Sequence, residues 1–255
     1  MKKNWLIIPE FEEREKYAAL AEQYNAGFEY NDFFLPHVYG NEEEIERRIA
    51  GYCSLKRDRS KDTLHGVFLD VVVSSDDPYI AEYSKKRFRQ SAEIAKRMEI
   101  KGVVFHSGLV RGVTGAKYLQ NWLERQEKFF RELCKEYPEL EFYMENTQET
   151  SPEHLFFLQE RMKDCPNFKF CLDYSHVVIS GTPAKEWVNV MSYYTVHMHI
   201  NDNDLCLDLH QVPGEGSIDW NEFKILTEPL AYTSVLIELT GLERQKKALE
   251  YMERI

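Results

Sequence analysis

The chain has 255 residues, of which 43% are hydrophobic and 29% are charged. This composition is typical of a folded globular protein and excludes a largely disordered chain. The 32 Lys and Arg residues against 43 Asp and Glu residues give a formal net charge of −11. Nucleic acid is therefore an unexpected partner, because contacts between basic side chains and phosphates dominate its binding.

The sequence contains no segment that predicts export or membrane insertion. No apolar run approaches the ~18 residues of a membrane-spanning helix, and the first apolar run, Trp5 to Pro9, is too short for a signal peptide. The cysteine count is odd and includes no Cys-x-x-Cys pair, which argues against a secreted disulfide framework. We therefore expect a cytoplasmic protein without a membrane partner, in which the thiols are buried and inert: Cys53, Cys134, Cys165, Cys171 and Cys206.

Strand-like apolar runs alternate with longer amphipathic stretches along the chain. Eight such runs begin 22 to 40 residues apart, close to the ~30 residues of a strand with its helix. This pattern predicts a closed (β/α)8 TIM barrel, and the lack of a linker predicts a single domain over residues 1–255. A doubly wound open sheet is the alternative, although no glycine-rich phosphate loop follows the first run. The runs begin near Trp5, Gly27, Thr63, Gly102, Glu141, Phe168, Thr195 and Val235.

Three dipeptides indicate helix starts, because a polar N-cap followed by proline at the first helical position is a common helix beginning. They are Asp77-Pro78, Ser151-Pro152 and Thr182-Pro183.

Ionisable residues recur where the strand-like runs end. In a barrel these ends meet at the rim that carries active sites. Unpaired charges are costly away from water, so a divalent cation is the simplest compensation. The residues are Glu29, His106, Glu145, Asp173, His176, His199 and Glu238.

Some of these residues have a structural alternative, since a carboxylate at a strand end is commonly a helix cap. Glu29 fits a cap and a substrate contact equally well. His197 and His199 share one face of a strand, so one of them is structural, and we expect His199 at the rim. The pattern places His65 in the middle of the third strand, and the apolar residues after it could form a loop over the rim.

Asp208 and His210 lie two residues apart in a polar segment. This spacing suits two ligands of one metal ion and equally an ordinary solvated loop. No Gly-x-Ser-x-Gly nucleophile elbow or Cys/His dyad context is present.

Taken in order, these motifs resemble the xylose isomerase-like TIM barrel superfamily, which includes sugar phosphate isomerases and epimerases, inosose-pathway enzymes and endonuclease IV (AP endonuclease family 2). The resemblance covers residues 27–241. It depends on the sequences around His106-Ser-Gly, Met-Glu145-Asn-Thr, Asp173-Tyr-Ser-His176, His199-Ile-Asn-Asp202, Asp208-Leu-His210 with Pro-Gly-Glu-Gly, and Ile-Glu238.

The resemblance implies a core metal site and two further groups of ligands. The core site of the superfamily corresponds to Glu145, Asp173, His199 and Glu238. By similarity to endonuclease IV, His65 and His106 would share one metal with Glu145, and His176, Asp208 and His210 would hold a third ion. In the short sugar epimerases only the core site is used, and the residue matching His176 contacts substrate oxygens. One to three divalent ions are expected, with zinc or manganese favoured.

The sequence also departs from both groups of relatives. Endonuclease IV has proline where this chain has Ser107, and the loop after Glu29 offers no basic residue for phosphates. The keto-sugar epimerases have arginine where this chain has Leu205. Their acidic residue a few positions past Glu145 has no clear counterpart, although Glu149 lies nearby.

The sequence therefore predicts a metal-dependent isomerase or epimerase of a small sugar, polyol ketone or sugar phosphate. Glu145 and Glu238 would transfer the proton next to a carbonyl, and His176 would stabilise the developing oxyanion. Phe33, Phe34 and Trp122 are candidate walls around a carbohydrate substrate, although Trp122 fits helix packing better. The alternatives are a multinuclear phosphoesterase and a metal-binding barrel without catalysis. Substrate identity and oligomeric state stay open.

Overall fold

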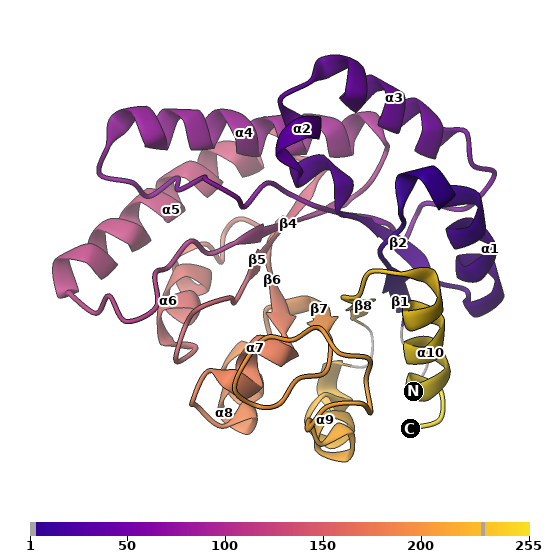
Figure 1. Cartoon of the computed structure of the whole chain (residues 1–255). Helices are drawn as coiled ribbons and strands as arrows, with labels where there is room; N and C mark the ends of the chain where they lie inside the picture. Colours follow the sequence, from indigo (N-terminus) through magenta and orange to yellow (C-terminus); the bar gives the residue numbers. More distant parts are fainter. Residues whose placement is uncertain (1–3, 231–232) are drawn as a thin grey trace.

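The computed structural model describes residues 4–230 and 233–255. Eight parallel strands form a closed barrel in chain order, and β8 pairs with β1 (Figure 1). The barrel prediction is confirmed, and every expected strand start lies within one residue of the observed one. The strands are β1 (Asn4–Ile7), β2 (Gly27–Tyr30), β3 (Thr63–His65), β4 (Gly102–His106), β5 (Glu141–Glu145), β6 (Phe168–Asp173), β7 (Thr195–Ile200) and β8 (Ser234–Ile237).

Helices connect the strands on the outside of the barrel, and α10 packs beside α1 (Figure 1). Helices α4 and α5 are the longest, with 20 and 21 residues. None of the helices in the described part of the chain is long and apolar enough to cross a membrane. The helices are α1 (Arg14–Tyr24), α2 (Pro36–Tyr39), α3 (Glu42–Cys53), α4 (Pro78–Arg97), α5 (Ala116–Glu136), α6 (Glu153–Arg161), α7 (Tyr174–Ile179), α8 (Ala184–Met191), α9 (Trp220–Leu226) and α10 (Leu242–Met252), with short 3-10 turns at Phe11–Glu13, Asp32–Phe34 and Glu228–Leu230.

The main hydrophobic core lies between the barrel and the helices. Successive side chains of a strand point to opposite faces, and the outward set is aromatic and aliphatic. Phe105 of β4 stacks on Phe88 of α4 with ring centroids 4.2 Å apart, and it also packs against Phe130 of α5 and Phe142 of β5. Each such buried ring stabilises the fold by ~1.5–3 kcal/mol.

On four strands the inward side chains change from apolar to ionisable toward the mouth of the barrel. Buried apolar residues form small clusters inside the barrel, among them Leu236 of β8, and Val104, Tyr143 and Cys171 of β4, β5 and β6. The next inward position lies two residues later on each strand. These four positions are occupied by Glu238, His106, Glu145 and Asp173. On these four strands an apolar position therefore lies beneath each polar position of the mouth.

The structure confirms one of the three predicted helix starts. Asp77 caps α4, accepting a 2.8 Å hydrogen bond from the Tyr79 amide. The other two predicted helix starts are wrong, because Pro152 and Pro183 themselves precede α6 and α8, and neither helix has a side-chain cap. Pro183 has an extended backbone, with ψ at 135°, so it cannot be the first helical residue.

The third strand is shorter than its apolar pattern predicts. His65 is its last residue rather than a central one, so its side chain reaches the mouth of the barrel. The following segment, residues 66–77, contains no helix or strand, and Val67, Val71 and Val73 are buried. The expectation of a loop after His65 is thus confirmed.

The five cysteines are free. Cys134 and Cys171 are buried, Cys53 and Cys165 are partly buried, and Cys206 is exposed. The expectation that all five thiols are buried is wrong for Cys206, because it lies in the solvent-facing part of the segment after β7.

Asp202 organises the segment after β7 that carries Asp208 and His210. Its buried carboxylate accepts hydrogen bonds from the amides of Asn203, Gly214 and Ile218 at 2.7–3.0 Å. It also accepts one from Trp220 Nε1 at 2.9 Å. A single side chain thus joins both ends of residues 203–218.

We expect Asp202→Ala to lower the free energy of unfolding by about 2–3 kcal/mol, because it leaves buried donors without their charged acceptor. Urea denaturation followed by circular dichroism measures this. Asp204→Ala is the control, since Asp204 accepts two amide hydrogen bonds in the same segment but is exposed. A loss no larger than that of the control would contradict the role of Asp202.

Candidate active site

Four predicted ligands converge at the mouth of the barrel. Glu145, Asp173 and His199 come from β5, β6 and β7, and Glu238 follows β8 directly. Each offers a ligand atom, and all four atoms lie within 4.8 Å of one another. His199 Nδ1 lies 3.2 Å from Glu145 Oε1 and 3.7 Å from Glu238 Oε2. The structure therefore brings together the whole core set.

The donor atoms of this set fit a cation. Both carboxylate oxygens of Glu145, Asp173 Oδ2, Glu238 Oε2 and His199 Nδ1 are buried, and none has a hydrogen-bond partner among residues 4–230 and 233–255. Buried oxygens of this kind are costly unless a positive charge satisfies them. Carboxylate and imidazole ligands suit zinc and manganese.

The pKa shifts of the core carboxylates also favour a cation at this position. Burial raises the pKa of Asp173 to about 8, and the nearby carboxylates of Glu238 and Glu145 add to this despite the opposing effect of His176. Burial alone would also raise the pKa of Glu145, but His199 and His106 bring it well below its usual range. Three carboxylates this close cannot all ionise easily without a cation.

A second group of potential ligands shares Glu145. His65 Nε2 and His106 Nε2 both lie 3.5 Å from Glu145 Oε2, and the three residues form a cluster with the spacing of metal ligands. Burial lowers the pKa of His106 to about 3, so its imidazole is neutral at pH 7 and free to bind a cation. The two oxygens of Glu145 thus face different groups, Oε2 toward this pair and Oε1 toward His199.

A third group joins His176, Asp208 and His210. His176 Nε2 and His210 Nε2 lie 3.2 and 3.0 Å from Asp208 Oδ2. Each histidine donates its Nδ1–H to a backbone carbonyl, His176 to that of Asn146 at 2.8 Å and His210 to that of Glu238 at 2.9 Å. Asp208 and His210 are therefore tied to the mouth of the barrel through His176 and Glu238.

Glu29 is neither a cap nor part of the cavity surface. Its carboxylate is fully buried below the core set, where Oε2 accepts hydrogen bonds from Thr63 at 2.6 Å and His197 at 2.9 Å. Its Oε1 lies 3.1 Å from His199 Nε2. Burial would raise the pKa of Glu29, but the two histidines bring it below its usual range. The alternation of Glu29 with Gly27 on one face of β2 could have indicated an inward carboxylate.

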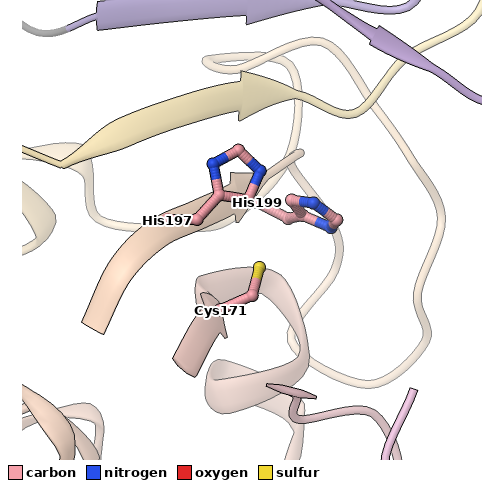
Figure 2. Close-up of side chains that lie close together, drawn as sticks. All are labelled: Cys171, His197 and His199. Atoms are coloured by element: carbon pink, nitrogen blue, oxygen red, sulfur yellow. The ribbon is translucent and has the colours of Figure 1, made fainter. Parts of the chain in front are cut away.

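His197 lies one inward position below His199. Figure 2 shows the two imidazoles on β7 with the thiol of Cys171 on the neighbouring strand β6. The three residues have the spacing of metal ligands. However, His197 is bound on both sides, by Glu29 and by Ser234 Oγ at 2.6 Å, and burial raises the pKa of the Cys171 thiol. The geometry therefore matches the expectation of a structural His197 beneath His199.

A cavity of about 580 Å³ opens beside these groups, lined in part by His106, His176 and Asp208. Its aromatic wall is Phe68, which the sequence reasoning missed. The Phe68 ring stacks on His106 with centroids 4.4 Å apart, and Phe34 packs edge-on against both Phe68 and His65. The apolar residues after His65 were the signal that could have indicated this wall.

Of the candidate walls, Phe33 is wrong, whereas Trp122 packs in the core, the alternative that its sequence favoured. Phe33 is 1% exposed and packs against Tyr52 in the core. Trp122 is also buried, and its indole N–H donates to the Ser107 carbonyl at 2.9 Å. Neither side chain lines the cavity. Phe33 of the 3-10 turn Asp32–Phe34 and Trp122 of α5 both pack into the main hydrophobic core.

The structure shows where the chain places Glu149 and Leu205, two positions at which its sequence departs from the keto-sugar epimerases. Glu149 is buried against Ser107, whose hydroxyl donates to it, and also accepts from the Thr147 amide at 2.7 Å. It therefore holds the ends of β4 and β5 together and does not face the core set. Leu205 is 47% exposed and has a left-handed backbone, with φ at 65°. It therefore faces solvent in the segment after β7.

Comparisons with known proteins decide the family. The sequence profile of the xylose isomerase-like TIM barrel family matches residues 19–255. The chain belongs to this family. An uncharacterized protein of Methanocaldococcus jannaschii, MJ1614, is 28% identical over 174 residues, which is 64% of this chain and 64% of that protein.

Solved structures with the xylose isomerase-like fold cover nearly the whole chain. A D-tagatose 3-epimerase-like protein superposes with a TM-score of 0.78 at 19% identity, covering 98% of this chain and 96% of that one. The TTHB071 protein of Thermus thermophilus, from a crystal soaked with zinc chloride, has a TM-score of 0.79 at 18% identity, with 98% and 97% covered. D-psicose 3-epimerase of Clostridium cellulolyticum, solved with D-tagatose, has a TM-score of 0.71 at 17% identity, with 98% and 97% covered.

We predict that zinc binding at His176, Asp208 and His210 releases protons at pH 7. Burial opposes the charge on His210, yet Asp208 and Glu238 raise its pKa to about 10. A raised pKa means that the free imidazole is protonated at pH 7, so an incoming cation must displace that proton. Affinity should therefore increase as the pH rises from 7 to 9.

Calorimetric titration with zinc in buffers of different ionisation enthalpy measures the released protons. The control is His210→Ala, which should release about one proton fewer. Equal proton release by the two proteins would contradict the prediction.

Proposed function

We propose that the protein is a metal-dependent isomerase or epimerase of a small sugar, polyol ketone or sugar phosphate. The observation that carries this proposal is the set of Glu145, Asp173, His199 and Glu238 at the barrel mouth, whose buried ligand atoms lack partners in the described residues. The likeness to a D-tagatose 3-epimerase-like protein and a D-psicose 3-epimerase supports the substrate class. The zinc-soaked relative supports the use of a divalent ion.

The four core residues would hold one divalent ion, zinc or manganese. A bound divalent ion supplies Lewis-acid stabilisation of the negative charge that develops when a proton leaves the carbon next to a carbonyl. The chain itself must move that proton. Glu145 and Glu238 reach the mouth from β5 and from the end of β8, so one carboxylate can remove a proton while the other returns it.

His176 is placed to stabilise the charge on the substrate. It lines the cavity, and its ring is held by the Asn146 carbonyl at 2.8 Å. Burial opposes its charge, but Asp173 and Asp208 raise the pKa of His176 well above its usual range. Its Nε2–H, which is paired with Asp208 at 3.2 Å in this structure, could donate to a developing oxyanion if the substrate displaced Asp208. The aromatic ring of Phe68 lines the same cavity, and Phe34 packs edge-on against it.

Solvent deuterium incorporation tests this function without knowledge of the product. The zinc- or manganese-loaded protein is incubated in D2O with ketoses, including D-tagatose, and their phosphates, and exchange next to the carbonyl is followed by NMR. We expect exchange in at least one sugar. Glu145→Gln should reduce that exchange by ~10²–10⁴-fold, the usual contribution of a proton-transfer group, with little change in melting temperature.

Glu141→Gln is the matched control. Glu141 lies at the opposite end of the same strand, where it pairs with Lys101 at 2.9 Å and accepts a hydrogen bond from Tyr143. It should retain full exchange. Absence of exchange across the panel, or full exchange by Glu145→Gln, would contradict the proposed function.

A second candidate function is phosphoester hydrolysis by a multinuclear site. The position of Glu145 favours this function. Its Oε1 faces His199, and its Oε2 faces His65 and His106. A carboxylate placed in this way could bridge two ions. The net charge of −11 favours a small phosphorylated substrate over DNA. A barrel that binds metal without catalysis would show metal but neither activity.

The number of ions per chain distinguishes these functions. The core set provides three carboxylates, whereas the other groups add only one, Asp208, so we expect one ion to survive gel filtration at pH 7. Further ions should appear only when zinc or manganese is supplied, and the double substitution His106→Ala/His210→Ala should remove them. Elemental analysis measures this. Three tightly bound ions, with cleavage of a phosphodiester or of DNA containing an abasic site, would favour the hydrolase.

A further inference from the structure

His199 is oriented differently from the other histidines at the mouth of the barrel. His65, His176 and His210 each direct Nδ1 at a backbone carbonyl, at 2.8–2.9 Å, and turn Nε2 toward a carboxylate. His199 does the reverse. Its Nδ1 faces the core carboxylates, and its Nε2 points away from the mouth toward a side chain, Glu29. The orientation of His199 therefore depends on the side chain of Glu29 rather than on a backbone carbonyl.

We propose that Glu29 is a positioning residue that holds His199 as the Nε2–H tautomer and thereby presents Nδ1 to the cation of the core site. The proposal rests on the proposed metal site. Glu29 Oε1 lies 3.1 Å from His199 Nε2 and is the carboxylate oxygen that faces that nitrogen. Neither atom has another hydrogen-bond partner in the described residues, and the two do not form a well-aligned hydrogen bond in this structure. Because a carboxylate oxygen can only accept, a proton between these two atoms belongs to Nε2. In the neutral imidazole the lone pair is then on Nδ1, which faces the mouth.

The surroundings hold Glu29 rigidly in this role. Its other oxygen, Oε2, accepts from Thr63 Oγ1 at 2.6 Å and is 2.9 Å from His197 Nε2. His197 is in turn fixed through Nδ1 by Ser234 at 2.6 Å. Glu29, Thr63 and both histidines are at least nine-tenths buried. The result is a chain of contacts from β8 through β7 and β2 to the core site, of the kind that orients metal-binding histidines and tunes their affinity.

Cys171 offers a rival explanation for the same histidines. Its thiol, His197 and His199 have the spacing of metal ligands (Figure 2). A cation bound there would compete with Glu29 and Ser234 for the nitrogens of these histidines. The two explanations differ in which residue controls zinc affinity, Glu29 or Cys171.

Zinc affinity, measured by competition with a chromophoric chelator on the full chain, tests the proposal. Glu29→Gln should weaken binding of the tightest zinc ion by about 10- to 100-fold, the usual effect of losing such a partner. Asp32→Asn is the matched control, because Asp32 is a buried carboxylate that pairs with Arg48 and Tyr52 away from the site. It should lower the melting temperature and leave zinc affinity unchanged. Cys171→Ala should also leave it within about twofold.

The tautomer of His199 gives a second measurement that needs no Glu29 variant. In the zinc-loaded wild-type protein, nitrogen NMR should show His199 with a proton on Nε2 and metal on Nδ1, assigned by the signals lost in His199→Gln. A proton on Nδ1, or unchanged zinc affinity in Glu29→Gln, would overturn the proposal. Loss of affinity in Cys171→Ala equal to that in Glu29→Gln would favour the rival site and overturn it as well.

Neither measurement depends on turnover. A protein that shows the expected affinities and tautomer but exchanges no sugar protons contradicts the proposed function alone. A protein that exchanges sugar protons while Glu29→Gln keeps full zinc affinity contradicts the role of Glu29 alone. Failure of the wild-type protein to bind zinc would overturn both.

Discussion

The mouth of this barrel is governed by the repulsion of three carboxylates that have little access to water. Glu145, Asp173 and Glu238 meet around His199 within 4.8 Å, where burial raises the pKa of Asp173 to about 8. Burying like charges is among the most expensive arrangements in a folded chain. The apolar layer beneath and the helices outside must therefore support a site that is unfavourable until a cation binds. Such a balance is typical of a functional site rather than of a stabilising one.

The histidines around this charge are fixed by two kinds of partner. Backbone carbonyls orient His65, His176 and His210, whereas side chains orient His197 and His199. The first kind follows directly from the path of the chain at each strand end. The second kind depends on contacts across the barrel and can be changed by substitution without a change in the backbone. Asp202 contributes indirectly, because it secures the segment that brings His210 to the mouth.

The residues whose roles the sequence did not identify share one property. Glu29, Phe68 and Glu149 acquire their roles from residues far away in the sequence, His199 for Glu29, His106 for Phe68 and Ser107 for Glu149. A carboxylate at a strand end has the same local pattern whether it caps a helix, contacts substrate or orients a ligand. The two incorrect helix starts have a different cause, since Pro152 and Pro183 take up N-cap positions that polar residues usually occupy.

The amino-acid sequence by itself determined the number of strands, their starting points and the residues at their ends. These features follow from local rules, namely the alternation of side chains along a strand and the ~30-residue repeat of strand and helix. The tertiary structure alone decided which ends face one another, which oxygen of Glu145 meets which histidine, and where Phe68 lies. Those outcomes depend on the register of eight parallel strands and on closure of β8 against β1. Distances between residues more than a hundred positions apart are set only when the whole barrel has closed.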